Sequence, residues 1–285
     1  MKEGLKMIIT IVGLGLIGGS MARRLRGFNN AVIRAYDKNP NTLTLVKKDG
    51  VADEFYTDSS EAVKDADLVI LCLYPELNVK FIKENAGFLK PGCVITDVSG
   101  VKEYVCEEIM KVIPEGVNFV GGHPMAGRET SGYESSTDTL FNNASYLVVP
   151  VKNSKPESVA LMRDMASYIG CNRIMTTSAH EHDEIIAYTS QLMHVVAVAL
   201  CNNPIIKRSS SFSAGSLRDC TRVAVINENM WSELFCENKK ALADRITEMQ
   251  QSLEDIKKAV LAEDKEELKD IMRKATDNKM KWLMD

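Results

Sequence analysis

A glycine-rich turn directly after a β-branched run most limits what this chain can fold into. Residues 8–12 read IITIV, which is typical of a buried strand, and glycines at 13, 15 and 18 follow as GxGxxG. The first glycine permits a tight turn, the second lets the backbone approach a pyrophosphate, and the third lets a helix pack closely on the strand. The pattern predicts a dinucleotide-binding turn. Its expected cofactor-binding residues are Gly13, Gly15, Leu16, Ile17 and Gly18.

Asp37 supports this interpretation and bears on which dinucleotide binds. It ends the next apolar run, residues 31–36, and follows Gly18 by about 20 residues, as expected for an acidic residue that bonds the ribose hydroxyls. A carboxylate at this place repels a 2′-phosphate, so we predict NAD as the cofactor. Lys38 and Arg34 lie close in sequence and leave NADP open at this stage.

The order of apolar and helix-forming segments predicts the fold class. Strands that alternate with helices form right-handed crossovers and a mostly parallel sheet. After Ser178 the strand signals stop, and the long stretches 180–200 and 238–285 are typical of helices. We predict an α/β N-terminal, Rossmann-type doubly wound domain (1–178) and an all-α C-terminal domain (179–285). Further strands are expected at 68–73, 93–96, 117–120, 146–151 and 173–177, and helices at 18–25, 77–88 and 156–169.

Composition limits the partners and the compartment. The formal charge is −4, from 35 basic and 39 acidic residues, so we expect neither nucleic-acid nor membrane binding. We expect that no apolar run approaches membrane-spanning length. The seven cysteines contain no CxxC pair and indicate reduced thiols of a cytoplasmic protein. We expect no metal, because His180 and His182 diverge on a helix and HExxH is absent.

Two histidines and an arginine cluster are candidates for chemistry. His123 lies in GGHPMAG (121–127), just after a predicted strand, where it is either a general base or a structural cap. His194 shares an apolar helix with Asp183, Ser190 and Gln191, and this polar stripe either lines a site or bonds a partner helix. The pair Arg218 and Arg222 flanks an aspartate. It is either a solvated surface pair or the anchor for a dicarboxylate.

These motifs together resemble the prephenate/arogenate dehydrogenase family of tyrosine biosynthesis. The matching stretches are GLGLIGGS (13–20), GGHPMAGRETSG (121–132), HEHDEIIAYTSQLMHVVAVAL (180–200) and SLRDCTRVA (216–224), with Trp231, Glu237 and Asn238 beyond. The resemblance implies that His123 is the catalytic histidine, which bonds the ring hydroxyl of prephenate. It further implies that the substrate-binding residues are Ser99, Glu129, Ser190, His194 and Arg222.

Two stretches depart from the family pattern. The family usually has Asp-x-Gly-Ser-Val-Lys, whereas residues 97–102 read DVSGVK, with the bridging serine one position early at Ser99. The usual Ser-His-Leu-Pro-His is SQLMH at 190–194, so Gln191 replaces the first histidine. Whether Ser99 takes the bridging role, and what Gln191 does instead, are open at this stage.

The predicted function is NAD-dependent oxidative decarboxylation of prephenate to 4-hydroxyphenylpyruvate. Arogenate dehydrogenase, giving tyrosine directly, is the alternative within the family. A β-hydroxyacid dehydrogenase is less favoured because helix 180–203 lacks a catalytic lysine. A non-catalytic dinucleotide sensor is also possible on fold alone.

The C-terminal helices predict a homodimer. Large apolar residues at 242, 246, 249, 253, 256 and 260 form a heptad-like stripe. The competing interpretation is that this stripe packs on the final helix, residues 265–282, within one chain. We favour the dimer, which the family resemblance also implies.

Overall fold

The computed structural model describes residues 6–284. In this part of the chain, eight strands form one sheet in the order β3-β2-β1-β4-β5-β6-β7-β8. All neighbouring strands run parallel except β6 and β7, which are antiparallel. The strands are β1 (Ile8–Val12), β2 (Val32–Tyr36), β3 (Glu54–Tyr56), β4 (Leu68–Leu71), β5 (Val94–Asp97), β6 (Asn118–Pro124), β7 (Ser145–Pro150) and β8 (Arg173–Thr176). The chain reverses its winding direction between β1 and β4, where doubly wound sheets bind their ligands.

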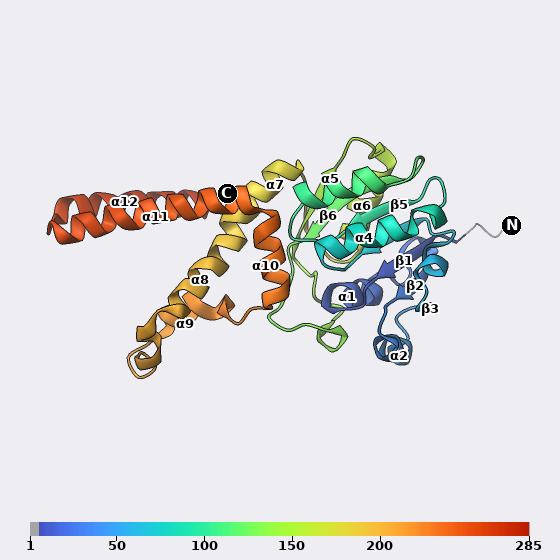
Figure 1. Cartoon of the computed structure of the whole chain (residues 1–285), viewed down its shortest axis with the longest axis horizontal. Coiled ribbons are helices and arrows are strands. Elements are labelled where there is room, and N and C mark those ends of the chain that lie inside the picture. The colour runs from blue at the N-terminus through green and yellow to red at the C-terminus, as the bar shows by residue number, and fades with distance from the viewer. Residues whose placement is uncertain (1–5, 285) are drawn as a thin grey trace. The chain divides into compact units, whose positions relative to one another are not determined.

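Helices cover both faces of this sheet, with a separate apolar core under each (Figure 1). One core contains side chains from α1 (Leu16–Leu25), α2 (Pro40–Asp49) and α6 (Pro156–Tyr168). The other contains side chains from α3 (Ser59–Val63), α4 (Pro75–Asn85) and α5 (Glu103–Val112). The predicted Rossmann-type α/β fold is therefore confirmed.

A helical region follows the sheet. It begins with α7 (Ala179–Ile186), a π-helical turn η4 (Ala187–Gln191) and α8 (Leu192–Asn202), so the predicted single helix is interrupted. Next come α9 (Gly215–Thr221) and α10 (Glu228–Glu237). Short 3-10 segments complete the connections: η1 (Phe28–Asn30), η2 (Ala86–Phe88), η3 (Tyr133–Ser135), η5 (Pro204–Arg208) and η6 (Arg222–Ala224).

The stretch Ala179–Asn202 is long and apolar enough to cross a membrane by length and composition alone. The expectation that no run approaches that length is wrong in this respect. Its buried polar side chains nevertheless bond to other elements of the protein: His182 to β6, Asp183 to the start of α5, and Gln191 to α10. In this structure the stretch is part of a folded domain.

The described chain forms two compact units, one up to Asn238 and one from Lys239 onward. The second unit is a hairpin of α11 (Lys239–Leu261) and α12 (Lys265–Trp282), which pack on each other. Side chains of the predicted stripe at Leu253, Ile256 and Val260 remain exposed. The proposed domain boundary near residue 178 stays a prediction.

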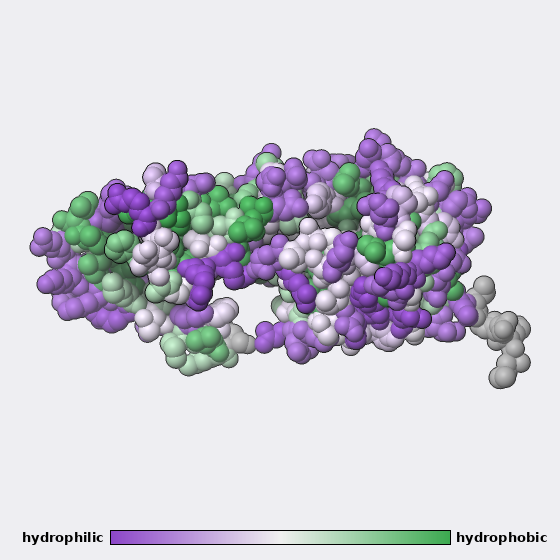
Figure 2. All heavy atoms as spheres, turned by 90° about the horizontal axis from the view of Figure 1, so that it is seen from below, coloured by the Kyte–Doolittle hydropathy of each residue, from purple (hydrophilic) through white to green (hydrophobic). Residues whose placement is uncertain are grey.

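Exposed apolar side chains collect on the helical elements. On the face drawn in Figure 2, green apolar residues lie among purple hydrophilic ones. The exposed apolar residues include Ile185, Tyr188, Met193 and Leu200 on the first unit and Leu253, Val260, Leu261 and Met272 on the second. Apolar surfaces of this kind are typical of interaction sites.

Candidate active site

The glycine turn after β1 has the geometry that a dinucleotide requires. Gly13 has a φ of +87°, in the left-handed region that favours glycine. A Cβ on Gly18 would lie 1.9 Å from the Gly13 carbonyl oxygen, whereas a Cβ on Gly15 would meet nothing within 4 Å. Gly15 is the N-cap of α1, which begins at Leu16. The open space therefore lies where backbone N–H groups and the helix dipole favour a pyrophosphate.

Asp37 lies beside this turn, directly after β2. Its Oδ2 accepts a hydrogen bond of 2.8 Å from the Leu14 backbone N–H, and its Oδ1 accepts one of 2.9 Å from the Asn39 N–H. These bonds fix the carboxylate at the glycine turn, where a ribose would lie in a bound dinucleotide. The predicted glycines and Asp37 are thus brought together, and these residues fit a dinucleotide.

His123 lies on strand β6 rather than after it. The predicted strand ended at Val120, but β6 continues to Pro124 and pairs His123 with Leu147 of β7. Gly122 allows this because a Cβ there would lie 2.4 Å from the Tyr146 hydroxyl and 2.7 Å from the Asp97 carbonyl oxygen. The strand therefore packs tightly on its neighbours and holds His123 rigidly at its carboxyl end.

His123 is bonded to a second histidine. Its Nδ1 lies 2.9 Å from Nε2 of His182 on α7. Burial, the His182 ring and the Lys102 ammonium group all lower the pKa of His123, to well below the ordinary histidine value. His123 is therefore neutral at pH 7 and able to accept a proton.

His182 is in turn bonded to Asp183, the next residue on α7. The His182 Nδ1 lies 2.6 Å from Asp183 Oδ1, and both side chains are almost fully buried. The two carboxylate oxygens also accept 2.8 Å bonds from the backbone N–H groups of Lys102 and Glu103. Asp183 thereby anchors α7 to the start of α5.

A fully buried ion pair lies close to these two histidines. Lys102 Nζ donates to Asp97 Oδ2 at 2.5 Å, and neither side chain is exposed. Asp97 also accepts bonds from the backbone N–H groups of Ser99 and Gly122. The pair thus ties the end of β5 to the strand that carries His123.

Among residues 6–284, the hydrogen bonds of Ser99 do not include His123. Its hydroxyl oxygen accepts a 3.0 Å bond from the Asn78 side-chain amide of α4, and the residue is buried. The serine that comes one position early in the sequence therefore bonds to a helix on the sheet face. Its predicted substrate-binding role stays a prediction, and no observed bond of Ser99 links the histidine to a cofactor.

His194 and Ser190 lie at the π-helical turn. The His194 Nδ1 donates a 3.0 Å bond to the Ser190 carbonyl oxygen, and the ring stacks on Trp231 of α10 with centroids 3.6 Å apart. Burial lowers the pKa of His194, the Ser190 bond raises it, and the charge of Arg222 lowers it, with a net decrease. The free nitrogen of this neutral ring is an acceptor for a substrate hydroxyl or amine.

Arg222 on η6 forms an ion pair with Glu129 in the loop after β6. This pair brings together two of the predicted substrate-binding residues, and both remain exposed. Arg218 forms a looser pair with its neighbour Asp219, with 4.0 Å between Nε and Oδ1, and both side chains are highly exposed. Of the two arginines, Arg222 is therefore the one that reaches the loop after β6, the strand that carries His123.

The remaining polar residue of the predicted stripe, Gln191, bonds a partner helix. Its Nε2 donates to the Leu234 carbonyl oxygen, and its Oε1 accepts from the Asn238 side-chain amide. Gln191 is buried and holds the end of α10, which carries Trp231. Where the family has histidine, this chain thus has a structural contact between helices.

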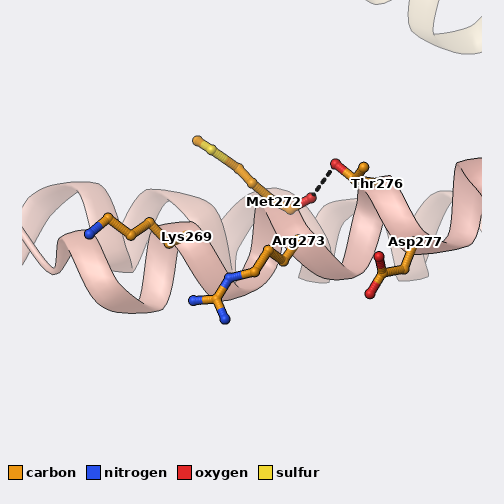
Figure 3. Close-up of a pocket in the computed structure, with 5 residues that line it drawn as sticks. All are labelled: Lys269, Met272, Arg273, Thr276 and Asp277. Carbon is orange, nitrogen blue, oxygen red and sulfur yellow. Dashed lines mark hydrogen bonds between the residues drawn. The ribbon is translucent and has the colours of Figure 1, made fainter.

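Surface hollows elsewhere in the described residues do not compete with this site. The one in Figure 3 has a volume of about 300 Å³ and is lined by Lys269, Met272, Arg273, Thr276 and Asp277. All five belong to α12, and the picture shows them pointing to different sides of that helix. Side chains from a single helix that do not converge cannot enclose a ligand. Within residues 6–284 no group of His, Cys, Asp and Glu side chains is arranged to hold a metal.

Two family models match most of the chain. Residues 21–175 match "Prephenate dehydrogenase, nucleotide-binding domain", and residues 178–274 match "Prephenate dehydrogenase, dimerization domain". The chain belongs to the prephenate dehydrogenase family. It is therefore an oxidoreductase, and the predicted family resemblance is confirmed.

Relatives and solved structures support the same family. Prephenate dehydrogenase from Bacillus subtilis is 31% identical over 284 residues, which cover 96% of this chain and 75% of the relative. Cyclohexadienyl dehydrogenase from Zymomonas mobilis is 30% identical and covers 90% of this chain and 89% of its own. The Aquifex aeolicus prephenate dehydrogenase structure with hydroxyphenyl propionate and NAD+ has a TM-score of 0.87 at 28% identity, covering 98% and 99% of the two chains.

His182 was not predicted as a neighbour of His123, because the two residues are 59 positions apart along the chain. From the sequence it was considered only as a metal ligand. The doublet His182–Asp183 on an otherwise apolar helix was the available signal, since buried charge needs a partner. Lys102 and Asn78 likewise gave no local sign of their contacts.

Proposed function

We propose that this enzyme catalyses the NAD-dependent oxidative decarboxylation of prephenate to 4-hydroxyphenylpyruvate. The observation that carries the proposal is His123, neutral and rigidly held on β6, close in sequence to the Glu129 carboxylate that pairs with Arg222. The Aquifex aeolicus structure, which contains NAD+ and a hydroxyphenyl compound, supports both the cofactor and the class of substrate.

The chemistry needs a base, a hydride acceptor and a grip on the substrate carboxylates. The glycine turn and Asp37 would hold NAD, which would supply the acceptor for the hydride of ring C4. His123 takes the proton of the C4 hydroxyl at its Nε2, so that a carbonyl forms. The ring carboxylate leaves as CO2, its bonding electron pair enters the ring, and His123 returns the proton to the C4 oxygen as the ring becomes aromatic. Arg222, Glu129, Ser190 and His194 are proposed to orient the substrate.

Arogenate is the second candidate substrate. The arogenate dehydrogenase structure from Synechocystis has a TM-score of 0.84 at 26% identity, covering 97% of this chain. The two substrates differ only in a keto or an amino group on the side chain. Supplying NAD with each in turn and following the absorbance of the reduced cofactor decides between them. Turnover of neither substrate would contradict the proposed function.

Asp37 is expected to set the cofactor preference. Its carboxylate is fixed at the glycine turn and would repel a 2′-phosphate, so the wild type should prefer NAD to NADP. The Asp37→Ser variant should narrow that preference by about tenfold, which corresponds to about 1.4 kcal/mol of discrimination. Steady-state kcat/KM for the two cofactors measures this. Equal values in the wild type would refute the assignment.

Arg222→Ala is expected to raise KM for the substrate by about 10- to 100-fold, with a much smaller change in kcat. A charged hydrogen bond held equally in the ground and transition states contributes about 1.5–3 kcal/mol to binding. Arg218→Ala is the matched control, because that arginine is exposed and paired only with its neighbour Asp219. An unchanged KM for Arg222→Ala, or an increase with Arg218→Ala alone, would move the anchor to Arg218.

We propose further that the protein is a cytoplasmic homodimer. The matched dimerization domain supports the dimer, as do the exposed side chains of the stripe on α11. The seven cysteines, all free thiols, fit a reducing compartment. Light scattering should give twice the 31.6 kDa of one chain. Leu253→Glu should shift the mass toward the monomer and Gln251→Glu should not. A wild-type mass of 31.6 kDa would contradict the dimer.

A further inference from the structure

His182 occupies a position from which it can control the proton on His123. It is 1% exposed, and each ring nitrogen has one partner: Nε2 faces His123 Nδ1 and Nδ1 faces Asp183 Oδ1. A histidine that merely fills space in a core does not require both contacts. The chain of three side chains therefore needs an assignment of its protons.

With both histidines uncharged and Asp183 a carboxylate, only one placement of the protons allows both hydrogen bonds of the chain His123–His182–Asp183. Each oxygen of Asp183 accepts a backbone N–H bond, and we assign the group as a carboxylate. A carboxylate only accepts, so His182 must carry its proton on Nδ1. Its Nε2 is then an acceptor, and the bond to His123 requires the proton of His123 to be on Nδ1. The Nε2 of His123 is left with its lone pair.

We propose that His182, held by Asp183, is a positioning residue that fixes His123 in the tautomer able to accept a proton at Nε2. Among residues 6–284, Nε2 of His123 has no hydrogen-bond partner, so it is free for a substrate hydroxyl. When His123 accepts that proton, its Nδ1–H bond to His182 persists and the new positive charge is stabilised through His182 toward Asp183. The inference rests on the proposed role of His123 as the base.

Burial is the main cause of the lowered pKa values of both histidines, and it keeps both rings neutral. Burial lowers the pKa of His182 more than the bond to Asp183 raises it, and the Lys102 ammonium lowers it further. Lys102 has the same effect on His123. Asp97 is paired with Lys102, and Glu237, whose burial raises its pKa to about 8, lies near Lys102 and Asp183. Because Glu237 itself titrates near neutrality, a pH profile alone would not identify the histidine, and a direct readout is needed.

Nitrogen-15 NMR of the full-length protein without substrate gives that readout. The chain has four histidines, so substitution assigns each ring. At pH 8 the wild type should show His123 protonated on Nδ1 and unprotonated on Nε2. In His182→Leu, the His123 ring should become a mixture of the two neutral tautomers, one protonated on Nδ1 and the other on Nε2. In His182→Gln the amide oxygen can take the place of Nε2 as acceptor, so the wild-type tautomer should be retained.

Turnover should follow the tautomer. We expect kcat to fall by about 10- to 100-fold in His182→Leu, part of the full value of a general base, and by less than about fivefold in His182→Gln. The exposed neighbour His180 provides the control, and His180→Leu should leave both readouts unchanged. Circular dichroism checks that each variant is folded.

Several results would overturn the proposal. If His123 of the wild-type protein carries its proton on Nε2, that result alone overturns the proposal, even when a variant fails to fold. The proposal is also overturned if His123 keeps its wild-type tautomer in His182→Leu, or if kcat falls equally in the Leu and Gln variants. If the tautomers respond as expected but neither prephenate nor arogenate is turned over, the positioning contact stands and the proposed function fails. The two failures are therefore distinguishable.

Discussion

Replacing His123 with asparagine is expected to lower kcat by about 10²–10⁴-fold, the usual contribution of a general base. Asparagine keeps a polar side chain on β6 but cannot accept a proton near neutral pH. The affinity for NAD should change little, since the glycine turn and Asp37 follow other strands of the sheet. Stopped-flow or steady-state kinetics with calorimetric titration of NAD would measure the two effects separately.

The pH dependence gives a second test of the same residue. The base must be neutral, and the pKa of His123 lies well below 6.5, so kcat/KM should fall as the pH is lowered through that pKa. This acid limb should disappear in His123→Asn. His180→Asn is the matched control on the exposed side of α7. Near-wild-type turnover in the His123 variant would remove that residue from the mechanism.

Replacing Lys102 with methionine is expected to lower the free energy of unfolding by about 3–5 kcal/mol. The variant fills similar space but leaves the Asp97 carboxylate buried without its cation, which is among the most costly single changes in a protein. Denaturant unfolding measures the loss. Lys90→Met, which breaks the more exposed pair with Asp67, should have a much smaller effect.

A double variant separates the pair from simple packing. Asp97→Asn combined with Lys102→Met removes both charges, and the asparagine oxygen can still accept from the Gly122 N–H. Most of the lost stability should then return, because no uncompensated charge remains. If the double variant is as unstable as Lys102→Met, the loss comes from packing around the lysine and not from the charge.

Every strand except β3 coincides with a predicted run, and the clearest sequence signals came from the long apolar runs. Strands β1 and β4 are buried on both faces of the sheet. Such strands consist of nearly continuous apolar residues, which can be recognised in the sequence. The edge strand β3 has only three half-buried residues, so it gave no pattern. The helix α2 was missed although Asn39 caps it, Pro40 opens it and Gly50 ends it, because its apolar stripe contains only two buried residues.

The candidate site was partly predictable for a related reason. His123, the glycine turn and Asp37 are each adjacent to a strand end, and position along the chain locates them. The contact of Gly122 with Tyr146 that extends β6 joins strands that are remote in sequence, as does the bond from His123 to His182. Periodicity describes one element at a time, so bonds between elements were outside its reach. The shifted serine is an example, since its partner Asn78 lies on α4.

The π-helical turn at Ala187–Gln191 determines how this chain tolerates changes of length. At its end the Leu192 N–H bonds the Ala187 carbonyl five residues back, so the turn holds one residue more than an α-helix would. Each α-helical residue rotates the side chains by about 100°. Because the wide turn absorbs one residue, deleting a single residue here would restore a regular α-helix and keep His182 and His194 in their present relative orientation. A deletion within α7 or α8 would instead rotate one histidine relative to the other by about 100°. The π-helical turn is therefore the place on this segment where the chain can lose a residue without turning the two histidines away from their partners.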